Sequence, residues 1–331
     1  KLDFRDGTAH RLNQEFVEPV LEFSTHTIDR LCGTVGLLTQ GALVSRTVAW
    51  CYDKHLFSGA TLNDLPADED GPRFVICASN LSTGSLFRFS RPYIADYRIG
   101  RMNVPEFPIA RAVAASSAFP PLLSPARLDL SKFSIFAEDQ QRRSSDQIDF
   151  KEVPAEVKRR AVLTDGGVYD NHGIEPIDDW ETIFVSDGGM PHTISSSGLW
   201  DWYGQTKRVM DVMDNQVRSL RRRALFRATD VVVPGNVPEP GDLSPSRCVY
   251  WGIGTDPRKY PDFSELECLP EDVLALSTQP TRLKNPGDQI RQALVNWGYA
   301  ICDRAIRRWY RPPNPTPPAW PFLGAIRLAN Q

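Results

Sequence analysis

The chain has 331 residues, of which 41% are hydrophobic and 24% charged, so it can bury a sizeable core in one large domain or two modest ones. Its net charge of −3 gives no electrostatic reason to bind nucleic acid, because phosphate binders usually carry a surplus of basic residues. No run approaches the ~18 apolar residues of a membrane span, so we expect any membrane contact to be peripheral. The scattered cysteines suit a reducing compartment, so we expect a cytoplasmic protein.

The first half of the chain predicts helices followed by a buried strand. Residues 15–50 show a mixed helical pattern, and a polar, turn-rich stretch follows at 62–72. The segment RFVICASN (73–80) predicts a buried strand because its centre is apolar. Polar Ser79 and Asn80 end this strand, and such a strand end is a common edge for a functional site.

An alanine-rich helix and an exposed loop come next. The segment IARAVAASSAFPPLLSP (109–125) predicts a helix that stops at Pro120 and Pro121, since proline cannot continue a helix. Residues 134–158 are charged and polar, and within them QQRRSSDQ (140–147) predicts an exposed loop or insertion.

Two short apolar strands then run directly into Asp-Gly-Gly. They lie in AVLTDGGVYDN (161–171) and TIFVSDGG (182–189). Apolar runs without alternation indicate strands that are covered on both faces, which is typical of parallel sheets in α/β proteins. We therefore predict the α/β class, with these two strands in a parallel sheet.

The last third predicts two long helices and two more strands before a proline-rich end. In chain order these are a helix at 205–227, strands at 230–234 and 247–253, a helix at about 288–310 and a tail at 312–331. The sequence shows no internal repeat and no sharp linker between domains. We therefore predict a single domain over 1–331, in which 199–311 forms the carboxyl-terminal helices and strands.

Cysteine and histidine are too scattered to suggest a metal site. The six cysteines contain no CxxC pair, and the five histidines do not gather near them. We expect reduced, mostly buried thiols, and we predict neither a metal nor a cofactor.

The first Asp-Gly-Gly places the carboxylate of Asp165 at the end of a strand. Ligands of open α/β sheets bind at such strand ends, and the two glycines allow a sharp turn with room for a partner. A lone Asp-Gly pair is more often a simple turn, so the surrounding sequence must decide between the two interpretations.

That surrounding sequence resembles the patatin-like family of lipid acyl hydrolases. LTDGGVYDNHGIEP (163–176) resembles the family's Asp-Gly-Gly motif, and RFVICASNLSTGSLFRFS (73–90) resembles its strand with a T-N-x-x-T-G stretch. ARAVAASSAFPPLLSP (110–125) resembles its A-S-x-A-x-P segment, and ETIFVSDGG (181–189) resembles the strand after the catalytic aspartate. The four segments keep the family order, and 73–190 is the best-matching core.

The resemblance implies a three-layer α/β/α fold with a mostly parallel central sheet, and cleavage of acyl-ester lipids by a Ser-Asp dyad. Asp165 would be the base that takes the proton of the serine, and Gly166 and Gly167 would shape its turn. Asp187 is a rival because it also precedes Gly-Gly. We favour Asp165, since the residues after it match the family motif more closely.

Three neighbouring side chains are weaker candidates for chemistry. His172 follows the motif and invites a triad interpretation, but a polar turn residue is the simpler explanation. Ser116 and Ser117 resemble helix-end and site-lining residues, because neither lies on a glycine-flanked elbow.

The sequence contains no nucleophilic serine of the expected kind. A G-x-S-x-G elbow needs glycines four positions apart, and none of the 22 glycines has such a partner. No glycine-rich stretch supplies oxyanion-hole amides either. In the family both elements come earlier, so we expect the serine to lie amino-terminal to Lys1, on a second chain or a missing part, or to have been lost in a pseudoenzyme. We predict that 1–331 alone is inactive.

The predicted function is thus a phospholipase or lysophospholipase whose partner is an acyl-ester lipid. The alternatives are a non-catalytic patatin-like scaffold that binds lipid or protein, and an α/β binding module unrelated to lipid. The helix at 205–227 bears on membrane contact, because arginines between Arg218 and Arg227 would attract anionic headgroups. A solvated or salt-bridged helix face is the other interpretation of these arginines.

Overall fold

The computed structural model describes residues 3–5, 8–39, 43–120, 123–136, 153–191, 194, 200–228, 247–260, 266–280, 282–310, 312 and 316–323. Contacts divide the chain into two compact units. Unit 1 contains Lys1–Gly173 and Leu283–Asn285, and unit 2 contains Ile174–Arg282 and Pro286–Gln331. The prediction that 1–331 is a single domain stays a prediction. The expected loop at 140–147 and strand at 230–234 lie outside the described residues.

Unit 1 is built on a six-stranded antiparallel sheet, so the prediction of a three-layer α/β/α fold with a mostly parallel central sheet is wrong. The strand order is β6-β5-β4-β3-β8-β7, and every neighbouring pair is antiparallel. The described chain is therefore a mixed α/β structure. The strands are β3 (Ile76–Asn80), β4 (Ser85–Ser90), β5 (Tyr93–Asp96), β6 (Gly100–Asn103), β7 (Ala126–Asp129) and β8 (Arg160–Asp165).

Short connections explain the antiparallel pairing of β3 with β4, of β4 with β5 and of β5 with β6. Residues 81–84 join β3 to β4, 91–92 join β4 to β5, and 97–99 join β5 to β6. A parallel pair needs a crossover of about a dozen residues or more, so such turns allow only hairpins.

The expected burial on both faces holds for β8, where Leu163 and Thr164 are buried, but not for β9 (Thr182–Asp187), where Phe184 is 42% exposed. The antiparallel strand β4 is also buried on both faces, at Leu86 and Phe87. Burial on both faces does not set the direction of pairing.

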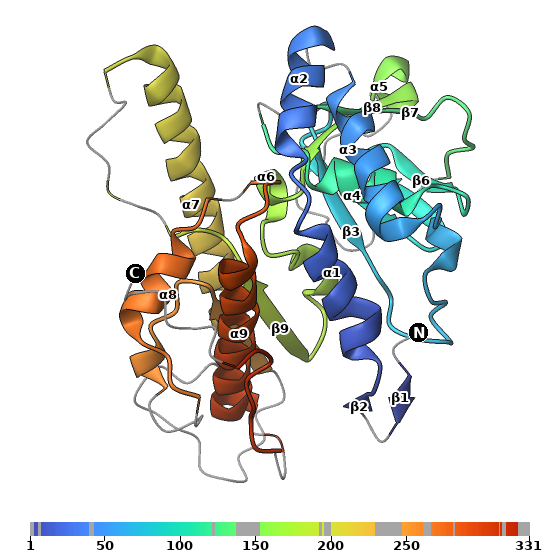
Figure 1. The fold of residues 1–331 in the computed structure, drawn as a ribbon. Coiled ribbons are helices and arrows are strands. Elements are labelled where there is room, and N and C mark those ends of the chain that lie inside the picture. Colours follow the sequence, from blue (N-terminus) through green and yellow to red (C-terminus); the bar gives the residue numbers. More distant parts are fainter. Residues whose placement is uncertain are drawn as a thin grey trace. The chain divides into compact units, whose positions relative to one another are not determined.

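The alanine-rich segment forms α4 (Ile109–Ser116), which ends before Pro120 as predicted. Ala112 and Ala115 pack into the core beneath the sheet, whereas Ala110 and Ala114 pack into the core around α3 (Val44–Tyr52). Small side chains on both faces let α4 lie closely between the sheet and α3 (Figure 1). This position brings the end of α4 to the end of β8.

The other elements of unit 1 are short helices and turns. They are β1 (Phe4–Arg5), β2 (Thr8–Ala9), α1 (Glu18–Phe23), α2 (Asp29–Thr39), α5 (Ala155–Arg159), α6 (Gly167–Asp170), π-helical turns at Asn13–Val17 and Asp53–Phe57, and a 3-10 turn at Leu62–Asp64.

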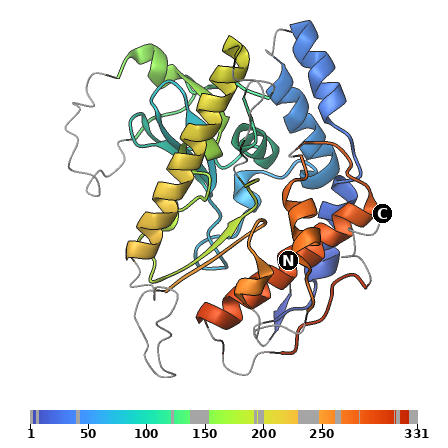
Figure 2. The same ribbon diagram turned by 90° about the vertical axis from the view of Figure 1, so that its left-hand side faces the viewer.

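Unit 2 contains the second Asp-Gly-Gly strand, β9 (Thr182–Asp187), which pairs parallel with β10 (Arg247–Gly252). The predicted long helix is α7 (Trp202–Ala228), drawn in yellow in Figure 2. Its Leu225 packs with Ile183 and Val185 of β9, so one end of α7 covers this small sheet. Parallel pairing thus occurs in the described chain, although not between β8 and β9 as predicted.

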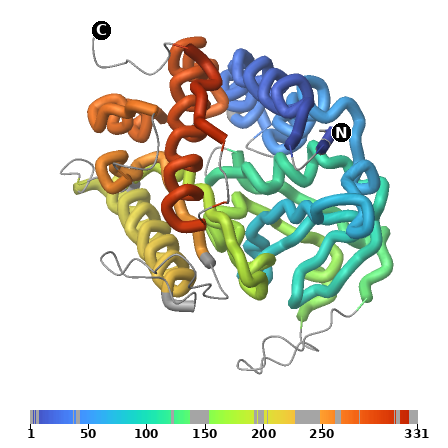
Figure 3. Tube along the Cα trace, turned by 90° about the horizontal axis from the view of Figure 1, so that it is seen from below, coloured from blue at the N-terminus to red at the C-terminus, as the bar shows by residue number. Residues whose placement is uncertain are grey.

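Two further helices of unit 2 lie side by side, α8 (Pro270–Ser277) and α9 (Asp288–Ala305) (Figure 3). Trp297 and Ile301 of α9 are buried in the core that the two helices share. A 3-10 turn at Glu175–Ile177, another at Pro257–Lys259 and a π-helical turn at Ile306–Tyr310 complete the unit. Within the described ranges, no helix is long and apolar enough to cross a bilayer.

Candidate active site

Asp165 is the last residue of β8, and its main chain is tied to the end of α4. The N–H of Asp165 donates to the carbonyl of Ala118 at 3.0 Å, and the N–H of Gly166 donates to the carbonyl of Ser116 at 3.0 Å. Two of the segments that resemble the patatin-like family, 110–125 and 163–176, therefore meet here.

The carboxylate of Asp165 is oriented by its own turn. Its Oδ1 accepts the N–H of Gly167 at 2.7 Å, and the residue is partly exposed. A Cβ on Gly167 would lie 2.9 Å from that oxygen and 2.5 Å from Oδ1 of Asn171, and a Cβ on Gly166 would lie 2.4 Å from the carbonyl oxygen of Cys77. Both glycines are therefore needed for the turn to approach its neighbours so closely.

A third family-like segment holds the turn through Ser79 of β3. The Ser79 hydroxyl donates to the carbonyl of Asp165 at 2.7 Å and accepts the N–H of Tyr169 at 3.0 Å. Ser79 is buried, so both hydrogen bonds are shielded from water. The segments 73–90 and 110–125 and the first part of 163–176, up to Gly173, thus come together in unit 1, while 181–189 belongs to unit 2.

Ser117 is oriented away from a nucleophilic role. Its hydroxyl donates to the carbonyl of Val113 at 2.9 Å, so the phenol of Tyr52, 3.1 Å away, must donate to Ser117. Burial raises the pKa of Tyr52 most, the hydrogen bond to Ser117 opposes that rise, and the charge of Asp165 adds to it. Tyr52 therefore stays protonated at neutral pH within electrostatic reach of Asp165.

The rival carboxylate, Asp187, has both oxygens engaged. Oδ1 accepts the N–H of Gly189 at 2.9 Å and Nη2 of Arg218 at 2.8 Å, while Oδ2 accepts the Tyr250 hydroxyl at 2.6 Å. The Asp187 and Arg218 side chains are only 10% and 15% exposed. Burial above all, then the hydrogen bond and charge of Asp187, raises the pKa of Tyr250 to about 12. Asp187 is therefore a clamp between β9, β10 and α7.

A buried carboxylate that the sequence analysis missed is Asp96. It is fully buried, and Oδ1 accepts the hydroxyl of Ser85 at 2.9 Å and Oδ2 accepts the amide of Asn80 at 2.8 Å. The Thr83 hydroxyl also donates to Oδ2 at 2.7 Å, so Asp96 organises the T-N-x-x-T-G-like stretch. The signal that could have found Asp96 is the group of three polar residues in one hairpin, because polar groups that become buried need hydrogen-bond partners.

The arginines of α7 contact their own unit, as the salt-bridged interpretation expects. Arg218 pairs with Asp187, Arg221 lies 3.5 Å from Oε2 of Glu175, and Arg222 lies over the Tyr250 ring at 5.6 Å. The side chain of Arg227 lies outside the described residues. These arginines are thus not simply a basic face turned to a membrane.

Five of the six cysteines are poor alternative nucleophiles because burial raises their pKa, namely Cys32, Cys51, Cys248, Cys268 and Cys302. All six thiols are free, and burial raises the pKa of Cys248 to about 12 and that of Cys32 to about 11. Thiolate, the reactive form, is scarce at neutral pH when the pKa is so high.

His172 is partly buried in the turn after α6.

Neither a protein-family model nor a curated protein matches this chain.

Proposed function

We propose that this chain supplies the base of a serine-type lipid acyl hydrolase, of the phospholipase or lysophospholipase type, in which Asp165 acts on a serine from outside residues 1–331. The observation that carries the proposal is the Asp165 turn. Its partly exposed carboxylate is held by the Gly167 N–H, and the backbone behind it is fixed by Ser116, Ala118 and Ser79.

The proposed chemistry starts from the weak nucleophilicity of a serine hydroxyl. A serine hydroxyl is a weak nucleophile until a nearby base removes its proton, and an oriented carboxylate can serve as that base. Asp165 takes the proton as the serine oxygen attacks the acyl carbonyl, and the proton then passes to the leaving alcohol. Water cleaves the acyl-serine ester in the second half of the cycle, with Asp165 again accepting a proton.

Apolar side chains beside the turn favour a lipid substrate. Phe119 is 65% exposed next to Ala118, and Val168 is 50% exposed next to Gly167. Both residues therefore offer apolar surface within one residue of groups that hold the Asp165 turn.

The test is complementation. Purified 1–331 is expected to hydrolyse no p-nitrophenyl acyl ester, and activity is expected when a G-x-S-x-G polypeptide from the native preparation is added. Asp165→Asn should abolish the restored activity. Full activity with Asp165→Asn would contradict the proposal and favour the non-catalytic, lipid-binding scaffold.

A further inference from the structure

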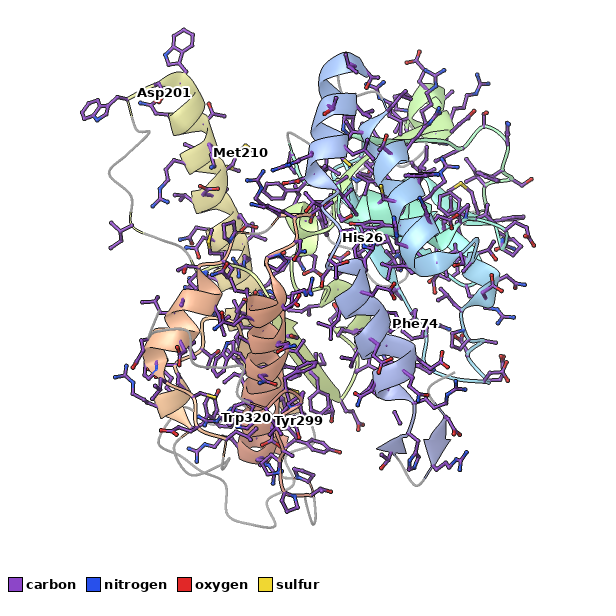
Figure 4. The ribbon with its side chains drawn as sticks, viewed as in Figure 1. His26, Phe74, Asp201, Met210, Tyr299 and Trp320 are labelled. Atoms are coloured by element: carbon purple, nitrogen blue, oxygen red, sulfur yellow. The ribbon has the colours of Figure 1, made fainter. Side chains whose placement is uncertain are left out.

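One face of α7 carries a row of exposed apolar side chains, interrupted at Thr206 and here called the apolar stripe. Its members lie within about 80° of one another on a helical projection, given 3.6 residues per turn. They are Trp202 (90% exposed), Val209 (57%), Met213 (62%), Val217 (36%) and Leu220 (57%). Met210, labelled in Figure 4, is 51% exposed at the edge of this stripe.

The opposite face of α7 fixes the direction of the apolar stripe relative to the rest of unit 2. Leu225 is buried against β9, and Arg218 pairs with Asp187. Leu220 is two residues from Arg218, which is a rotation of about 200° around the helix. The stripe therefore faces away from the β9–β10 sheet. Soluble surfaces carry single exposed apolar residues, but a row of five large ones marks an interaction face.

Charge distinguishes between possible partners. Residues 202–228 contain seven basic and two acidic side chains, a formal net charge of +5 in a chain whose net charge is −3. Arg223 is exposed about 40° from Val209 at one edge of the stripe, and Lys207 is exposed about 80° from Val217 at the other edge. Pairing α7 with α7 of a second copy would bring two strongly basic helices together, whereas an anionic lipid surface complements both the charge and the apolar stripe.

We propose that α7 is a membrane-docking helix that lies in the plane of an anionic lipid bilayer with its apolar stripe in the headgroup region. Amphipathic helices with a basic flank bind in this way, and tryptophan favours that depth. Trp200 (94% exposed) and Trp202 are at the amino-terminal end of the helix. The inference goes beyond the acyl hydrolase proposal and does not depend on it, because docking requires no turnover.

The test is flotation of the 331-residue chain with phosphatidylcholine vesicles that contain or lack phosphatidylglycerol. Binding is expected to the anionic vesicles, and Met213→Glu with Leu220→Glu should weaken it about tenfold or more. The matched control is Leu38→Glu with Leu274→Glu, on α2 and α8, where the side chains are 79% and 64% exposed. This control adds the same charge and should bind like the wild type.

Two further double variants separate the apolar contribution to binding from the electrostatic one. Met213→Ser with Leu220→Ser should also weaken binding without added charge, and Lys207→Glu with Arg223→Glu should weaken binding to anionic vesicles only. Circular dichroism checks that each variant is folded. Absence of wild-type binding, equal losses in stripe and control variants, or a wild-type dimer that the stripe variants dissociate would overturn the proposal.

Discussion

The two Asp-Gly-Gly turns of this chain are alike in sequence and local geometry but differ in what surrounds them. In both, Oδ1 of the aspartate accepts the N–H of the second glycine, at 2.7 Å for Asp165 and 2.9 Å for Asp187. Asp187 is then locked by Arg218 and Tyr250, whereas the Asp165 turn is held through its backbone by α4 and Ser79. A local motif thus sets a turn, and distant residues set its role.

The largest expected difference between the turns concerns their first glycines. Gly166→Ala would place a Cβ 2.4 Å from the Cys77 carbonyl oxygen, a main-chain atom that cannot easily move, while a Cβ on Gly188 would meet nothing within 4 Å. We expect Gly166→Ala to lower the free energy of unfolding by about 3 kcal/mol and Gly188→Ala to change it by about 0.5 kcal/mol or less. Urea unfolding measures both, and equal losses would contradict the geometry.

Removal of the clamp should destabilise the second turn by a smaller amount. Arg218→Ala removes an ion pair from Asp187, whose side chain is 10% exposed, and we expect a loss of about 2 kcal/mol in unfolding free energy. The matched control is Arg223→Ala on the same helix, where the side chain is exposed and the expected change is about 0.5 kcal/mol or less. Indistinguishable thermal midpoints for the two variants would show that the ion pair contributes nothing.

The smallest expected effect is a loss of unfolding free energy at alkaline pH. The pKa of Tyr250 is raised to about 12, so the neutral phenol is stabilised by folding. This contribution is complete below pH ~10, the ordinary tyrosine pKa, and is lost as the pH rises towards 12. A two-unit shift corresponds to about 2.7 kcal/mol at most, and solvent screening of a partly exposed group reduces this to about 1 kcal/mol.

Tyr250→Phe should therefore flatten the fall in unfolding free energy between pH 10 and 12, a window taken from the raised pKa of this side chain. Tyr299→Phe, at a side chain that is 39% exposed, is the control and should leave the fall unchanged. If the unfolding free energies of wild type and Tyr250→Phe fell by the same amount over this pH range, Tyr250 would make no contribution to the alkaline loss of stability.

The sequence predicted those features that depend on short stretches of chain. Apolar runs gave β8 and β9, alanine content gave α4, and helical periodicity gave α7 and α9. The sequence did not predict the direction of strand pairing correctly, because burial on both faces also occurs in this antiparallel sheet. Periodicity predicted the helix at 205–227, but not that its apolar side chains are exposed.

The candidate site could be predicted only as far as its turn. Asp165 and its two glycines stand next to one another in the sequence, so the motif identified them. Arg218 is 31 residues from Asp187, and Tyr52 is 65 residues from Ser117, so no local pattern links them. Asp96 was missed because Asn80, Thr83 and Ser85 lie 11 to 16 residues from it, so the group is recognised only once the strands are paired.

The most direct test of the central claim compares Asp165→Asn with Asp187→Asn in the serine-complemented preparation, with p-nitrophenyl ester hydrolysis and thermal unfolding measured on the same samples. We predict that Asp165→Asn lowers the rate by about 10³-fold or more while the thermal midpoint changes little, and that Asp187→Asn lowers the midpoint while the rate per folded molecule stays within about threefold. A wild-type rate with Asp165→Asn, or equal losses of rate in both variants, would contradict the assignment of Asp165 as the base.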